Sequence, residues 1–98
     1  SGAVVIGGIP RVGQTLQYQL RDPLSADSDL KSVLKHSVSE WGRPLASLVF
    51  ACTGRGKSLF GGDGHDASLL QSQLGQHPSA GFFCNGEIAP VGPKNCIH

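Results

Sequence analysis

The side chains best suited to chemistry in this 98-residue sequence gather at two glycine turns. One turn, residues 52–58, carries Arg55, and the other, residues 81–87, carries Asn85 and Glu87. An arginine presents a fork of N–H donors that suits a carboxylate, and a glutamate accepts hydrogen bonds from an amine. Neighbouring glycines let a ligand approach the backbone closely. The two turns therefore predict a small-molecule pocket in which Arg55 anchors a carboxylate and Glu87 an amine.

Seven residues make up this predicted ligand-binding site: Cys52, Gly54, Arg55, Gly56, Asn85, Gly86 and Glu87. The residue types leave a second arrangement open. Arg55 and Glu87 would then pair with each other across the two turns, fix both turns, and leave no open pocket.

A phosphate loop is a further alternative at the first turn. Residues 51–58 fit a relaxed P-loop pattern in which Ala51 replaces the first glycine. Such a loop must open a helix whose free N–H groups hold the phosphates. The glycine-rich residues 61–64 follow so soon after Ser58 that this helix would have scarcely one turn, which disfavours phosphate binding.

A cysteine-dependent enzyme is another alternative, because Cys52 precedes Arg55 and Lys57, and nearby cations activate a thiol. The candidate general bases are His65, His77 and His98. A small, half-buried strand cysteine without chemistry explains Cys52 better than a nucleophile does, and we expect the protein not to be an enzyme. The cysteines and histidines form no pair at ligand spacing, so we expect no metal site and no cofactor.

The hydrophobic pattern predicts an α+β fold with element order β-β-α-β-α-β-β. Strands are expected at residues 4–6, 15–22, 45–50, 80–84 and 94–98, and helices from Ser25 or Asp27 to about Glu40 and from His65 or Asp66 to Leu74. The near-continuous apolar run 45–50 indicates a strand covered on both faces. The order of strand, glycine turn, helix and strand predicts that the two turns are neighbours, because a right-handed crossover returns the chain beside its first strand. We therefore expect one two-layer domain spanning residues 1–98, with both helices on one face of a mixed or mainly antiparallel sheet.

Composition excludes several classes of function. Hydrophobic residues make up 39% and charged residues 15% of the sequence, and the net charge is +1. These values indicate a folded domain with no electrostatic preference for nucleic acid or a membrane surface. No apolar run approaches the roughly 20 residues that a membrane span needs. Three sparse cysteines favour a reducing compartment, so we expect a cytoplasmic protein.

Two segments carry a family resemblance. Residues 48–56, with Cys52, Gly54 and Arg55, and residues 78–90, a Gly-Phe-x-x-x-Gly-Glu-Ile-x-Pro turn, resemble the C-terminal FIST domain. The family is named after F-box and intracellular signal transduction proteins. The resemblance implies an intracellular sensory module that binds a small ligand such as an amino acid, and not an enzyme. A protein–protein interaction module without a small ligand is the alternative that it leaves open.

The resemblance also carries expectations about residues and partners. It transfers to Gly54, Arg55, Gly56, Gly86 and Glu87, and secondarily to Cys52 and Asn85. FIST proteins usually contain an N-terminal FIST half, so the resemblance implies that this chain is a fragment whose partners include a FIST N-terminal domain or other signalling domains. Without such a partner, the surface that it covers is exposed, and this exposed surface would favour homo-oligomers.

Overall fold

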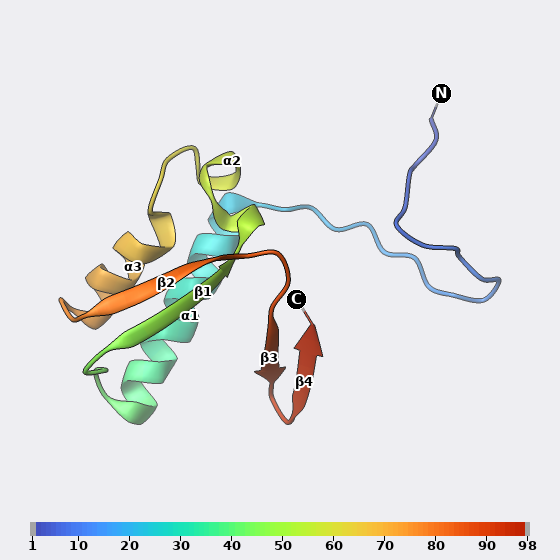
Figure 1. Ribbon diagram of the computed structural model, residues 1–98. Helices are drawn as coiled ribbons and strands as arrows, with labels where there is room; N and C mark the ends of the chain where they lie inside the picture. The colour runs from blue at the N-terminus through green and yellow to red at the C-terminus, as the bar shows by residue number, and fades with distance from the viewer. Residues whose placement is uncertain (1, 98) are drawn as a thin grey trace.

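The computed structural model describes residues 2–97 and confirms the α+β class (Figure 1). Its elements in chain order are α1 Pro23–Trp41, β1 Ser47–Cys52, the 3₁₀ turn η1 Thr53–Arg55, α2 Lys57–Phe60, α3 His65–Leu74, β2 Ser79–Cys84, β3 Ile88–Val91 and β4 Lys94–Ile97. Both predicted helices are present as α1 and α3, and the glycine-rich residues 61–64 form the predicted loop.

The strands form two small sheets, where the sequence predicted a single one. β1 and β2 pair in parallel, in register from Ser47 opposite Ser79 to Cys52 opposite Cys84. A parallel pair needs a long crossover, which α2 and α3 provide, and this places the ends of the two glycine turns beside each other as predicted. β3 and β4 form a separate antiparallel hairpin.

Helix α1 begins earlier than predicted because two residues favour a start at Pro23. The Ser25 N–H donates to Asp22 Oδ2 at 2.8 Å, which makes Asp22 the N-cap. Pro23 has no N–H to lose at the first helical position. The helix ends as predicted, where Gly42 takes a φ of +78° and its N–H donates to the Val38 carbonyl at 2.9 Å.

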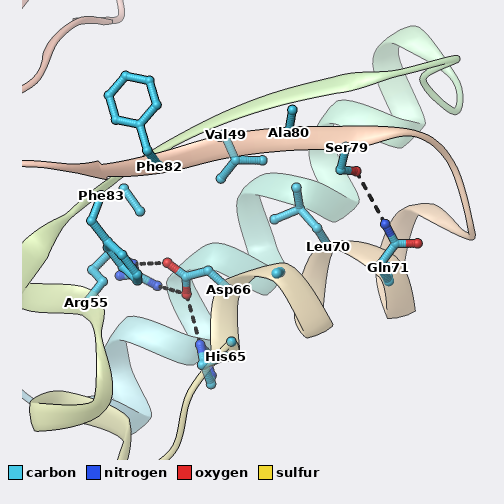
Figure 2. A pocket seen from close by; sticks show the side chains of 14 residues that line it. Val49, Arg55, His65, Asp66, Leu70, Gln71, Ser79, Ala80, Phe82 and Phe83 are labelled. Atoms are coloured by element: carbon cyan, nitrogen blue, oxygen red, sulfur yellow. Dashed lines mark hydrogen bonds and ion pairs between the residues drawn. The ribbon is translucent and has the colours of Figure 1, made fainter.

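The hydrophobic core lies between the helices and one face of the β1–β2 sheet. Its buried side chains are Leu69, Leu70 and Leu74, all from α3. From α1, a stripe at helical spacing is half-buried: Ala26, Leu30, Leu34 and Val38. Val33 and Trp41, the other large apolar side chains near this spacing, are exposed. Figure 2 shows α3 beneath the sheet, with Leu70 pointing toward the strands.

The opposite face of the β1–β2 sheet is open. Leu48, Phe50 and Phe82 are 76%, 54% and 65% exposed, and the two phenylalanine rings meet edge to face with centroids 5.2 Å apart. The prediction that this strand is covered on both faces is therefore wrong, because both helices pack on one side.

The two predicted N-terminal strands are not formed. Residues 2–22 contain no strand, and most of this segment extends away from the helices and sheets (Figure 1). Leu16, Tyr18 and Leu20 alternate as a half-buried strand would, yet they are 60%, 78% and 91% exposed. Alternation yields a strand only where a sheet edge pairs with it and a surface buries its apolar side, and within residues 2–97 this segment pairs with no strand and leaves its apolar side exposed.

Gly81 yields a first test of the parallel pairing. A Cβ at this position would collide with the backbone of Val49, its register partner on β1. Gly81→Ala should therefore destabilise the fold by about 1–3 kcal/mol, as overpacking does. For a domain of this size the melting temperature should fall by about 4–8 °C per kcal/mol.

Gly62→Ala is the matched control, because a Cβ there meets no atom within 4 Å. Thermal unfolding followed by circular dichroism measures both variants. Equal melting temperatures for Gly81→Ala and Gly62→Ala would contradict the close β1–β2 approach.

Candidate functional site

The candidate site is built on an ion pair between Arg55 and Asp66. Arg55 ends η1, directly after β1, and Asp66 lies in the first turn of α3. Arg55 Nε donates to Asp66 Oδ2 at 2.6 Å and Nη2 donates to Oδ1 at 2.9 Å, a bidentate geometry. Their side chains are only 28% and 12% exposed. The pair therefore ties the end of the parallel strands to the start of the helix that packs beneath them.

His65 extends this pair to helix α1. Its Nδ1 lies 2.9 Å from Asp66 Oδ1 and its Nε2 lies 3.0 Å from Asp27 Oδ1, while its ring stacks on Phe60 at a centroid distance of 3.5 Å. Carboxylate oxygens only accept hydrogen bonds. The contacts to Asp66 and Asp27 can therefore both be hydrogen bonds only when each ring nitrogen of His65 carries a hydrogen. The Arg55 guanidinium lies 5.4 Å from the centre of the Phe60 ring. We call Asp27, Arg55, Phe60, His65 and Asp66 the charged cluster.

Within the charged cluster, the pKa values of Asp27, Arg55 and Asp66 are shifted toward the ionised forms. Burial raises the pKa of the Asp66 carboxyl, but the hydrogen bonds and charges of Arg55 and His65 outweigh burial and hold that pKa below its ordinary value. The hydrogen bond to Asp66 likewise raises the pKa of Arg55. The hydrogen bond from Lys31 lowers the pKa of Asp27 despite partial desolvation.

A pocket of about 280 Å³ opens between the β1–β2 sheet and α3, beside this ion pair (Figure 2). Its lining is mostly apolar, and its side chains include Val49, Ala51, Ala67, Leu70 and Phe83. Arg55 and Asp66 line it together, and Gln71 and Ser79 supply further polar groups, with Gln71 Nε2 donating to Ser79 Oγ at 3.3 Å. An apolar cavity with a few fixed polar groups is the usual form of a small-molecule site.

Comparison with known proteins identifies the family. The model of the FIST C domain matches residues 1–90. The chain belongs to the FIST C domain family. This family is associated with signal transduction.

Relatives of this FIST C domain include two mycobacterial proteins. An uncharacterised protein of Mycobacterium tuberculosis (strain H37Rv) is 44% identical over 99 residues, and one of Mycobacterium bovis is 40% identical over 99 residues. Each alignment covers 100% of this chain and 26% of the relative, so the chain spans about a quarter of the length of these proteins. No solved structure matches the chain. Within residues 2–97, no helix is long and apolar enough to cross a membrane.

Of the seven predicted site residues of the FIST C domain, the structure brings Arg55 to the pocket. The predicted alternative, an ion pair between Arg55 and Glu87, is not formed, because Asp66 occupies the guanidinium. Glu87 does not line the pocket. Its Oε1 is shielded from solvent and has no hydrogen-bond partner within residues 2–97. Asn85 is exposed.

The glycines of the two FIST motifs, Gly54, Gly56 and Gly86, lie outside the pocket and differ in what surrounds them. A Cβ at Gly54 would collide with the Arg21 guanidinium, so a side chain there would displace Arg21. Gly86 has a φ of +128°, which L residues rarely adopt. Gly56 has an ordinary φ of −86° and is the N-cap of α2. None of these three glycines lines the pocket.

The cysteine and phosphate alternatives gain no support from this geometry. Cys52 Sγ accepts from the Gly54 N–H at 3.4 Å, whereas His65 bonds to carboxylates and His77 to Ser47 and the Gly75 carbonyl. His98, the third proposed base, lies outside the described residues. Helix α2 has four residues, as the glycines predicted, which is too short for a phosphate cradle. Within residues 2–97 no group of histidine, cysteine and carboxylate side chains could hold a metal ion.

Sequence reasoning missed Asp66 and His65 as partners of Arg55. A half-buried guanidinium needs a carboxylate, and Asp66, at the start of a helix that follows the same turn, was the available signal. The apolar lining, which includes Ala67 and Leu70 of α3, was not predicted either. Pairing of positions distant in sequence cannot be read from local patterns.

Removing one member of the Arg55–Asp66 pair should destabilise the domain. Asp66→Asn leaves the Arg55 charge partly buried without a counter-charge, and we expect a loss of about 1–3 kcal/mol in the free energy of unfolding. Glu40→Gln is the control, because it removes the exposed His36–Glu40 pair and should change stability by at most about 0.5 kcal/mol. Urea unfolding distinguishes them, and equal losses would contradict a structural role for the pair.

Acid should remove the same stabilisation. The folded-state pKa of Asp66 lies below the ordinary value of 3.8, so its contribution is complete above that value. It is then lost as the pH falls through the folded pKa. The free energy of unfolding should therefore decline below about pH 4, and Asp66→Asn should flatten this decline. If the free energy of unfolding declined equally steeply with acid in Asp66→Asn and in the parent, carboxyl groups other than Asp66 would be responsible for the decline.

Proposed function

We propose that this FIST C domain is a non-enzymatic sensory module that binds a small ligand with an apolar body and a carboxylate, such as an apolar amino acid. The observation that carries this proposal is the position of Arg55 on the wall of a mostly apolar pocket. A cation at the edge of an apolar cavity selects a ligand with both properties, because the two parts are satisfied separately.

Arg55 keeps donors available for a ligand. Nε and Nη2 bond to Asp66, and Nη2 also lies 3.4 Å from the Ala26 carbonyl. The two Nη1 hydrogens have no hydrogen-bond partner within residues 2–97. A ligand carboxylate accepting from Nη1 would add a charge-assisted hydrogen bond without breaking the ion pair. Asp66 thus holds the guanidinium in place for binding.

Asp66 also takes the role that the sequence gave to Glu87. Its carboxylate lines the pocket, whereas Glu87 does not. A carboxylate offers about four lone-pair sites, and Arg55 and His65 occupy only part of them. An ammonium group beside the ligand carboxylate would therefore find an acceptor in Asp66. The apolar side chain would then lie against Leu70 and Phe83.

Calorimetric titration of the purified chain with apolar amino acids tests this proposal. Arg55→Lys keeps the positive charge but loses the fork, and we expect it to weaken binding about 10–100-fold. Ala67→Leu fills the pocket from α3 and should abolish binding while the helix is retained.

Ligand variants provide the matched controls. The amide of the same amino acid lacks the carboxylate, and the corresponding keto acid lacks the ammonium, so both should bind more weakly than the parent. Equal affinity of the amide and the acid, or unaltered affinity in Arg55→Lys, would contradict Arg55 as the anchor. Circular dichroism confirms that each variant is folded.

A protein-interaction role is the second candidate, and the open sheet face favours it. Leu48, Phe50 and Phe82 form a contiguous apolar patch with more than half of each side chain exposed. The chain spans about a quarter of its relatives' length, so proteins of that length hold further chain that can cover this patch. We propose that the patch docks a FIST N-terminal domain.

Analytical ultracentrifugation with a separately produced FIST N-terminal domain tests this docking. Phe50→Asp should weaken the complex at least about tenfold, because a charge would be buried in its apolar centre. Val33→Asp, on the exposed side of α1, is the control and should leave binding unchanged. A complex insensitive to Phe50→Asp, or only self-association of the chain, would contradict this choice of partner.

A further inference from the structure

Cys52 and Cys84 occupy the same position on the two parallel strands. Each is the last residue of its strand, Cys52 on β1 and Cys84 on β2, and the two are register partners. Neighbouring strands lie about 4.7–4.9 Å apart, and register partners in a parallel pair point to the same face. A disulfide spans Cα separations of about 4.4–6.8 Å. The backbone of β1 and β2 thus presents these two cysteines at bonding separation.

Both thiols are free and held only weakly. Cys52 Sγ accepts from the Gly54 N–H at 3.4 Å, and Cys84 Sγ donates to the Phe82 carbonyl at 3.9 Å. Sulfur hydrogen bonds of this length are weak, so little is lost when either side chain turns toward the other. Both residues are half-buried, which leaves a path for a small oxidant. Cys96, the third cysteine, lies on β4 opposite Ala89.

Cys52 directly precedes the turn that carries Arg55, because it is the N-cap of η1. The thiolate is the form of cysteine that attacks a peroxide. We assign the first attack to Cys52 and the resolving role to Cys84, its register partner.

We propose that Cys52 and Cys84 form a reversible intramolecular disulfide when the protein meets hydrogen peroxide. The Cys52 thiolate attacks one peroxide oxygen, the O–O bond breaks, and a sulfenic acid and one water result. The Cys84 thiol then attacks the sulfenic sulfur, the S–O bond breaks, and a second water leaves as the S–S bond forms. Two electrons pass from the two thiols to the peroxide, and an external dithiol reverses the step by exchange.

The bond would join the two chain segments that lead to the candidate site. Cys52 precedes η1, which holds Arg55, and Cys84 precedes the turn that holds Glu87. A disulfide closes the whole crossover through α2 and α3 into one loop and reduces the entropy of the unfolded chain. The oxidised domain should therefore unfold at a higher temperature. This inference is independent of the proposed ligand.

Peptide mapping after peroxide treatment tests the proposal. Trypsin separates the three cysteines, because residues 36–55, 58–94 and 95–98 fall into different peptides. We expect the non-reduced digest of monomeric protein to contain peptide 36–55 joined to peptide 58–94, and dithiothreitol to release both. The Cys96→Ser variant should give the same cross-linked product. Its melting temperature should also rise when peroxide oxidises it, as expected for the parent protein.

The Cys84→Ser variant tests which thiol reacts with peroxide first, because it lacks the proposed resolving thiol. In that variant a dimedone adduct should accumulate at Cys52 after peroxide, because no resolving thiol remains. Full alkylation of both Cys52 and Cys84 after peroxide, or disulfides to Cys96 as abundant as the expected one, would overturn the proposal.

Discussion

The ion pair between Arg55 and Asp66 is the contact on which this arrangement depends. It joins the turn after β1 to the first turn of α3, and α3 supplies the buried leucines of residues 2–97. His65 carries the connection to Asp27 on α1. Both members of the pair are partly buried, so neither charge is tolerated alone. The pair therefore fixes the helix layer against the sheet and, in the same geometry, sets a cation on the wall of the pocket.

Local sequence was sufficient to predict the elements whose spacing and capping residues mark where they begin and end. The α3 stripe and the glycine that caps it predicted that helix, because spacing and capping act within a few residues. The order of strand, glycine turn, helix and strand predicted that β1 and β2 are neighbours, since a crossover returns the chain beside its first strand. Arg55 was predicted as a site residue because its fork of N–H donors suits a carboxylate and its neighbouring glycines let a ligand approach closely.

Contacts between distant positions were not accessible to the same reasoning. Residues 15–22 have the alternation of a strand, but a strand also needs a partner edge, which local sequence does not specify. Glu87 and Asp66 both offered a carboxylate to Arg55, and only the packing of α3 decides between them. The open face of β1 was likewise unpredictable, because an apolar run does not tell whether one or both faces are covered.

The central claim is that a small carboxylate ligand enters the pocket between the β1–β2 sheet and α3. Nitrogen-15 and carbon-13 NMR of the chain, titrated with an apolar amino acid, measures this directly because it reports the position of binding. We expect the signals of the Arg55 Nε–H group and of the pocket residues Ala67, Leu70 and Gly81 to shift together with a single affinity, while the signals of β3 and β4 stay unchanged. Shifts confined to the β3–β4 hairpin, or no shifts at millimolar ligand, would contradict it.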